Sequence, residues 1–197
     1  MKTNISKFLK NYLEVINSQL NKIDENILNK FINIIEYSIK KKKTIFVCGN
    51  GGSAAISNHY VCDYLKLIRT NTKFKPKVIS LSSNHELISA IANDFDYSKI
   101  FAYQLETLAT KGDILILISS SGNSKNIINA IKTSKKMGVI SIGFSGFKGG
   151  YLKKNCNCSI NINLKNYGQS EDSHHILMHC LMQYLIKKNS NKKTLRI

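Results

Sequence analysis

The chain has 197 residues, of which 43% are hydrophobic and 9% aromatic, as expected for a globular domain of ordinary size. No apolar run approaches the length of a membrane-spanning helix, and an odd count of five cysteines argues against a disulfide-stapled scaffold. The net charge of +17 would attract acidic small molecules, but the lysines are scattered, so we attribute most of it to a compositional bias toward Lys, Asn and Ile.

Two amphipathic helices are predicted before the first strand, over residues 5–22 and 24–42. Asp24 can cap the second of them. This N-terminal helical arm must bury its apolar stripe against the core or against another subunit. The basic start of the chain is not followed by the apolar segment of a signal peptide, which predicts a cytoplasmic location.

Strands and helices then alternate along the chain. Strands are predicted at 44–48, 77–81, 114–118, 138–144 and 158–164, and helices at 54–67, 82–91, 100–109, 125–137 and 171–186. This order predicts an α/β fold, a single doubly wound five-stranded parallel sheet whose ligands bind beyond the carboxyl ends of the strands. We divide the single domain (1–197) into the arm (1–42), the α/β core (43–165), and a C-terminal helix with a basic tail (166–197) that is expected to fray from Lys187.

The most informative segment joins a buried strand to a helix. The aliphatic run Ile114–Ile118 predicts a strand covered on both faces, and Ser119–Ser124 supplies four serines, one glycine and one asparagine before the helix at 125–137. Backbone N–H groups and the positive end of a helix favour an anion at such a turn, so the loop could surround a phosphate with neutral donors. A serine-rich helix cap without a ligand is the alternative. No Gly-Lys-Ser/Thr follows the glycine, which disfavours a nucleoside triphosphate.

A second glycine-rich turn follows the first strand. Its sequence, Gly49-Asn-Gly-Gly-Ser53, lets the backbone come close to a ligand. The third glycine comes too early for the dinucleotide-binding pattern.

Titratable side chains gather on two of the predicted helices. His59 and Asp63 share one face, and Glu171, His175 and His179 follow one another at intervals of four. If the two faces met, then His59, Asp63, Glu171 and His179 would form a cluster suited to Zn²⁺ or to proton transfer. Solvated or hydrogen-bonded histidines are the alternative.

Five motifs then occur in a specific order: Cys48–Ser53, Asn93–Phe95, Ser119–Ser124, Gly149–Gly150, and Glu171 with His174 and His179. Together they resemble the flavodoxin-like sugar isomerase (SIS) fold, and within it the phosphoheptose isomerase branch, over the whole chain. The resemblance implies an aldose–ketose isomerase that converts sedoheptulose 7-phosphate to D-glycero-D-manno-heptose 7-phosphate by proton transfer through a cis-enediol. It also implies a place in heptose, capsule or lipopolysaccharide biosynthesis.

The resemblance further implies a homotetramer with active sites at subunit boundaries and one Zn²⁺ per subunit. The implied metal ligands are His59, Asp63, Glu171 and His179, and the implied catalytic residues are Asp63, His179 and Glu171. The implied substrate-binding residues are Asn50, Gly51, Gly52, Ser53, Asn93, Asp94, Ser119, Ser120, Ser121, Ser124 and Glu171.

Two residues depart from the family pattern, which usually has Glu at the position of Asp63 and Gln at the position of Glu171. Aspartate is one methylene shorter, and a displacement on the order of 1 Å can cost about 100-fold in rate. The added charge of Glu171 should hold a dication more firmly. The pair of changes indicates a subfamily with a related task or a different phosphosugar.

Two other functions remain open from the sequence. The first is a non-catalytic SIS module that binds a phosphosugar or a protein such as a replication initiator, although the four possible metal ligands argue against it. The second is nucleic-acid binding through the lysines at 40–43 and the basic tail, which no recognised binding motif accompanies.

Overall fold

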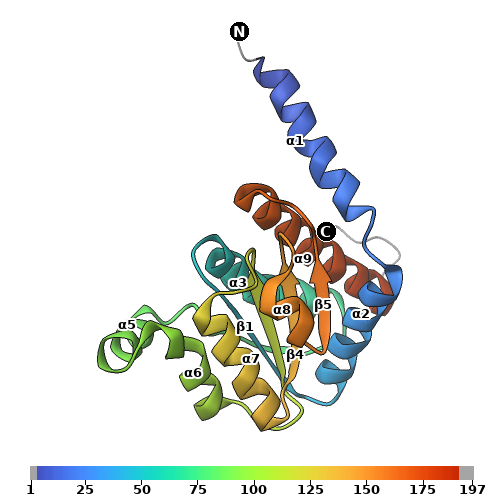
Figure 1. The fold of residues 1–197 in the computed structure, drawn as a ribbon. Coiled ribbons are helices and arrows are strands. Elements are labelled where there is room, and N and C mark those ends of the chain that lie inside the picture. Colours follow the sequence, from blue (N-terminus) through green and yellow to red (C-terminus); the bar gives the residue numbers. More distant parts are fainter. Residues whose placement is uncertain (1–3, 191–197) are drawn as a thin grey trace.

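A five-stranded parallel sheet lies at the centre of the computed structural model, which describes residues 4–190 (Figure 1). Its strands are β1 (Thr44–Gly49), β2 (Lys77–Ser80), β3 (Ile114–Ser119), β4 (Ile140–Ser145) and β5 (Cys158–Asn161). Their order is β2-β1-β3-β4-β5, and every neighbouring pair is parallel. This confirms the predicted α/β class. The strand order reverses between β1 and β3, which opens a crevice at their carboxyl ends.

Helices cover both faces of the sheet. They are α1 (Ile5–Leu20), α2 (Glu25–Lys40), α3 (Gly52–Asp63), α4 (Arg69–Asn71), α5 (His85–Asp94), α6 (Ile100–Leu108), α7 (Lys125–Met137), α8 (Gly150–Asn155) and α9 (Tyr167–Asn189), with a π-helical turn η1 (Tyr64–Ile68) and a 3-10 turn η2 (Tyr97–Lys99). Within residues 4–190, none of the helices combines the length and the apolar character that crossing a bilayer requires.

Side chains of the central strands alternate between two hydrophobic cores. Val47 and Ile116 belong to the core under α2, α3 and α9, whereas Cys48 and Leu117 belong to the core under α5, α6, α7 and α8. This alternation follows from the two-residue period of a strand. Both faces are therefore buried, as the aliphatic run at 114–118 predicts.

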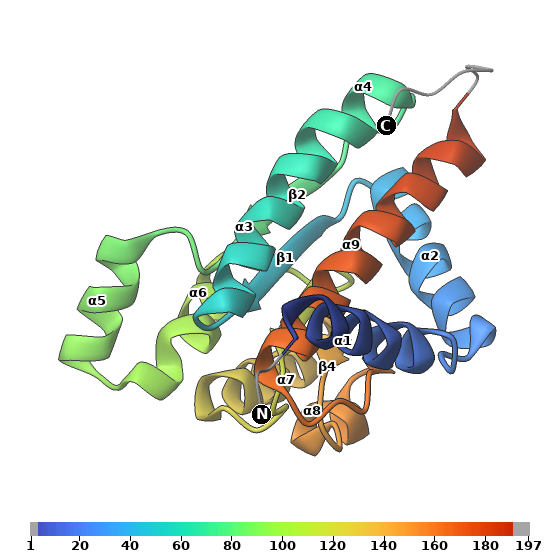
Figure 2. The ribbon, with the colours of Figure 1, turned by 90° about the horizontal axis from the view of Figure 1, so that it is seen from above.

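The helices α3 and α9 lie side by side and run in the same direction (Figure 2). Asn166 caps the start of α9, because its side chain accepts a hydrogen bond from the backbone N–H of Gln169 at 3.0 Å. The end of α9 is held by Glu36, which pairs with Lys188 at 3.0 Å and accepts from Asn189 at 2.6 Å. The prediction that the chain frays from Lys187 is therefore wrong for residues 187–189, which are helical. The tail from residue 191 lies outside the described residues.

The helix α1 extends away from the sheet and touches the rest of the chain mainly along α9 (Figures 1 and 2). The Tyr12 hydroxyl donates to Asp172 Oδ2 at 2.6 Å, and Ile16 is buried. The apolar residues on its other side are exposed, among them Ile5, Phe8, Leu9 and Leu13. The predicted helical arm is present, and this chain alone covers only part of its apolar surface.

The short helix α8 was not predicted, since Gly149 and Gly150 indicated only a turn. It packs directly on β4, where Gly143 has no side chain: a Cβ atom there would collide with Leu152 and lie 3.1 Å from Cys156 Sγ. Leu152 is fully buried as a result.

Candidate functional site

A pocket of about 160 Å³ lies at the carboxyl ends of β1 and β3, where the sheet topology predicts a ligand site. Its lining residues are Asn50, Ser53, Ile118, Ser119, Ser120, Ser121, Ser124, Tyr167 and Glu171. Three helices, α3, α7 and α9, begin at this pocket. The N-terminus of a helix carries a partial positive charge, so the pocket favours an anion although no lysine or arginine lines it.

The serine loop supplies hydroxyl groups that other contacts leave available. Ser120 Oγ is buried and has no hydrogen-bond partner, and Ser124, the N-cap residue of α7, makes no side-chain capping bond. By contrast, Ser119 and Ser121 each accept a hydrogen bond from a backbone N–H of the loop at 3.2 Å. A buried hydroxyl without a partner is costly, so Ser120 indicates a site completed by a ligand oxygen.

Glycine is required in the middle of this loop. Gly122 has a φ of +66°, and a Cβ atom there would collide with the carbonyl oxygen of Gly149. The loop thus packs against the backbone of the turn before α8, which fixes its shape.

Asn50 connects three segments around the pocket. Its amide forms a reciprocal pair with Asn126 on α7, with distances of 3.0 and 2.8 Å. The Tyr97 hydroxyl donates to Asn50 Oδ1 at 3.1 Å. The turn after β1, the first turn of α7 and the segment between α5 and α6 are held together in this way.

Glu171 faces this pocket from the second turn of α9. Its carboxylate lies against Gly52 at the start of α3, because a Cβ atom on that glycine would collide with Glu171 Oε2 and lie 2.6 Å from its carboxyl carbon. The absence of a side chain at Gly52 therefore makes room for the carboxylate.

Farther along the same two helices lies a cluster of three imidazoles and one carboxylate. His59 Nδ1 lies 3.3 Å from His175 Nε2, and His59 Nε2 lies 3.4 Å from His179 Nε2. Asp63 Oδ1 is 3.4 Å from His59 Nε2, and Asp63 Oδ2 is 3.3 Å from His179 Nε2. Burial and the neighbouring rings of His179 and His59 lower the pKa of His175 below its usual range, which favours the neutral ring.

This cluster fits a divalent metal ion. One ligand atom from each of His59, His175 and His179 can be chosen so that all lie within 4.8 Å of one another. Asp63 is only 6% exposed, and its Oδ2 makes no regular hydrogen bond. Zinc bonds to nitrogen of about 2.0–2.1 Å would place tetrahedral ligand atoms about 3.3–3.4 Å apart. The Nε2 atoms of His59 and His179 and the Asp63 carboxylate have such separations, whereas His175 faces the other nitrogen of His59.

The structure separates the predicted site residues into two groups. Asn50, Ser53, the four predicted serines and Glu171 line the pocket, whereas His59, Asp63 and His179 form the cluster. Glu171 belongs to no metal-binding cluster of this kind among the described residues. His175, which the predicted ligand set omits, belongs to the cluster. Its spacing of four from His179 was the available signal.

The remaining predicted residues lie outside the pocket lining. Gly51, the N-cap residue before α3, has a φ of +53° and is exposed. Asn93 and Asp94 end α5, where they are exposed and joined by a hydrogen bond of 2.9 Å. Their predicted contacts with the sugar stay predictions. Tyr167, which lines the pocket, and Asn126, which positions Asn50, were not predicted.

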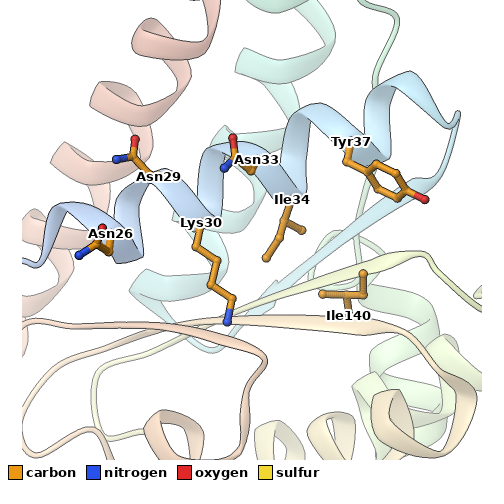
Figure 3. A pocket seen from close by; sticks show the side chains of 7 residues that line it. All are labelled: Asn26, Asn29, Lys30, Asn33, Ile34, Tyr37 and Ile140. Carbon is orange, nitrogen blue, oxygen red and sulfur yellow. The ribbon is translucent and has the colours of Figure 1, made fainter.

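A larger hollow of about 520 Å³ lies along α2, next to Ile140 at the start of β4 (Figure 3). Lys30 and Ile34 point from α2 toward the strand that carries Ile140, and Lys30 Nζ donates to the carbonyl oxygen of Asn157 at 2.7 Å. The hollow is lined mainly by asparagine amides and aliphatic side chains. It contains no carboxylate or imidazole, so we assign the chemistry to the pocket and the cluster.

Comparisons with known proteins agree with this assignment. Residues 7–146 match the family described as the SIS domain. The phosphoheptose isomerase of Campylobacter concisus is 36% identical over 146 residues, which cover 74% of this chain and 77% of the relative. That of Aliarcobacter butzleri is 34% identical over 158 residues, covering 80% and 83%. The solved phosphoheptose isomerase of Neisseria gonorrhoeae superimposes with a TM-score of 0.84 at 22% identity, covering 93% of this chain and 97% of that one, and so supports the fold.

Proposed function

Because the chain belongs to the SIS domain family, in its phosphoheptose isomerase branch, we propose that the pocket beside the serine loop binds and isomerises a phosphosugar. The protein is an isomerase that acts on sedoheptulose 7-phosphate and forms D-glycero-D-manno-heptose 7-phosphate. The buried, unpartnered hydroxyl of Ser120 at the convergence of three helix N-termini is the observation that carries this assignment.

The phosphate would lie against the serine loop. Ser120 and Ser124 would donate to its oxygens, together with backbone N–H groups at the start of α7. Ser119 and Ser121 can rotate their hydroxyl protons toward the same oxygens while still accepting their loop hydrogen bonds. The phosphate would in this way anchor the sugar so that its other end reaches Glu171.

We assign the proton transfer to Asp63, which stands where the family usually has Glu, whereas Glu171 stands where the family usually has Gln. The Asp63 carboxylate would remove a proton from C1 of the ketose while the C1 hydroxyl passes its proton to the oxygen on C2, which gives the cis-enediolate. Return of the proton from Asp63 to C2 leaves the oxygen on C1 as the carbonyl of the aldose. A positioned general base of this kind contributes about 10²–10⁴-fold to a rate.

The cluster of His59, Asp63, His175 and His179 lies beside the pocket, since His175 follows Glu171 by one helical turn, about 6 Å. We propose one zinc ion per subunit there, supported by the burial of the Asp63 carboxylate beside the rings of His59 and His179. When bound, zinc would polarise the sugar carbonyl as a Lewis acid. The catalytic roles assigned to Asp63 and His179 stay predictions, because neither residue lines the pocket of the described chain.

Three wider assignments belong to the same proposal. A homotetramer with sites at subunit boundaries is supported by the exposed apolar side of α1 and by a pocket smaller than the roughly 300–1,000 Å³ of a typical ligand site. A cytoplasmic location is supported by the free state of all five cysteines. The product would enter heptose-containing capsule or lipopolysaccharide synthesis.

Solvent exchange tests the reaction directly. The protein is incubated with sedoheptulose 7-phosphate in D₂O, and NMR follows deuterium at C1 and the signals of the aldose. We expect exchange in the wild type and a loss of about 100-fold or more in Asp63→Asn, with His85→Ala, an exposed histidine of α5, as the control. Phosphosugar binding without any exchange would instead indicate a sensing module.

A further inference from the structure

Two carboxylates stand next to each other on α9, beside a pocket that favours an anion. Glu171 lines this pocket, whereas its neighbour Asp172 does not. Successive residues of a helix are turned by about 100° from each other, so the two side chains leave the same turn of α9 on adjacent stripes. A second carboxylate facing a phosphosugar would repel it, so the direction of the Asp172 side chain matters for binding.

The helix α1 holds this second carboxylate. It lies across the first turns of α9 (Figure 2). The Tyr12 hydroxyl donates to Asp172 Oδ2 at 2.6 Å, a length typical of a hydrogen bond to an ionised carboxylate. Among residues 4–190, Asp172 forms no ion pair with a lysine, arginine or histidine. The tyrosine hydroxyl therefore fixes the direction of this charge.

Tyr12 is well placed to act as the donor. Ile16, one turn later on α1, is buried, and Gln169 Nε2 on α9 donates to the carbonyl oxygen of Tyr12 at 3.5 Å. The hydrogen bond to Asp172, burial, and the negative charges of Asp172 and Glu171 raise the pKa of Tyr12 to about 12. The hydroxyl group therefore keeps its proton at neutral pH and remains a donor.

We propose that Tyr12 is a positioning residue for substrate binding, because it holds the Asp172 carboxylate against α1 so that only Glu171 faces the phosphosugar. Without the hydroxyl, the Asp172 side chain is free to adopt other rotamers, and those that bring its charge nearer the pocket weaken binding. The repulsion acts on the substrate and on the transition state alike, so the loss falls on affinity rather than on the chemical step. The inference takes the identity of the ligand from the proposed function, and it holds for a bound phosphosugar whether or not that sugar is isomerised.

Calorimetric titration with sedoheptulose 7-phosphate and steady-state kinetics test this role together. Tyr12→Phe removes only the hydroxyl and should raise Kd and KM by about 3- to 10-fold, the range of one net hydrogen bond. The kcat value should stay within about 2-fold of the wild type. Adding Asp172→Asn to this variant removes the charge and should return Kd to within about 2-fold of the wild type. A purely structural loss at Tyr12 would not be repaired by this second change.

Tyr184→Phe removes an exposed hydroxyl farther along α9 and is the control that should bind like the wild type. Should circular dichroism show that Tyr12→Phe is unfolded, Asp172→Asn alone tests the inference, because it should bind at least as tightly as the wild type. An unchanged Kd in Tyr12→Phe, no recovery in the double variant, or weaker binding in Asp172→Asn alone would overturn the inference. Binding without turnover would overturn only the isomerase assignment, and a wild type that binds no phosphosugar would overturn both.

Discussion

At the scale of single residues, the pocket relies on neutral groups. Ser120 and Ser124 offer hydroxyls, three helix N-termini offer N–H groups, and the one charged side chain in the lining is Glu171. A carboxylate near a bound phosphate is unfavourable as a binding contact. Its presence is therefore better explained by contact with the sugar than by recognition of the phosphate.

Replacing Ser120 by alanine should weaken phosphosugar binding without destabilising the protein. The hydroxyl has no partner in the free protein, but a hydrogen bond to a charged phosphate is worth about 1.5–3 kcal/mol, or about 10–100-fold in Kd. Calorimetric titration with sedoheptulose 7-phosphate measures the change. Ser159→Ala removes another buried, unpartnered hydroxyl, on β5, and should leave affinity unchanged. Equal affinities for both variants would remove Ser120 from the site.

His174 should make the stability depend on pH. Burial lowers its pKa to about 4, although the backbone of Ser145 opposes the shift, whereas the unfolded chain titrates near 6.5. Between these values the unfolded state binds more protons, so stability is fully present above about pH 6.5 and is lost as pH falls toward 4, by about 3 kcal/mol. Urea unfolding at pH 7 and pH 5 should show a weaker dependence in His174→Leu than in the wild type. An unchanged dependence would contradict the assignment, and His85→Ala is the control.

At the scale of elements, the close packing of α8 on β4 depends on one missing side chain. Gly143→Ala should destabilise the protein by about 1–3 kcal/mol, because the methyl group would collide with Leu152. The double variant Gly143→Ala/Leu152→Ala should lose less than the sum of the single losses, as measured by urea unfolding. Gly168→Ala, where the nearest atom would be 3.2 Å away, should have little effect. Additive losses would show that the two residues do not compete for space.

Most elements could be predicted because their signals are local. The serine loop follows a run of aliphatic residues, so both its place and its ligand class could be inferred. The helix α8 was missed because its leading glycines indicate a turn, and the π-turn at Tyr64–Ile68 was missed because one extra residue leaves no periodic signature. The residues of the candidate metal cluster were harder to predict than the secondary structure. Their spacing puts Glu171, His175 and His179 on one stripe of a helix, but only the packing of α9 shows that this stripe runs from the pocket to the cluster.

At the scale of the whole molecule, the exposed side of α1 should form an interface between copies of the chain. Leu9 and Leu13 are 55% and 54% exposed, and burying such residues is worth about 1.5–3 kcal/mol each. Light scattering should show a tetramer for the wild type and smaller species for Leu9→Glu/Leu13→Glu. Leu108→Glu on α6, where the leucine is 49% exposed, is the matched control. A monomeric wild type, or a tetramer in the double variant, would contradict the interface.

The chain has a net charge of +17, but no lysine or arginine lines the pocket. The positive charges therefore act on the phosphosugar from a distance, which affects the kinetics of binding. Distant lysines act through solvent and are screened over about 8–10 Å at moderate ionic strength, whereas the helix N-termini act at contact. Added salt should therefore slow the association of the phosphosugar and leave its dissociation almost unchanged. Long-range capture of the substrate and its retention are thus assigned to different parts of the molecule, and ionic strength separates them.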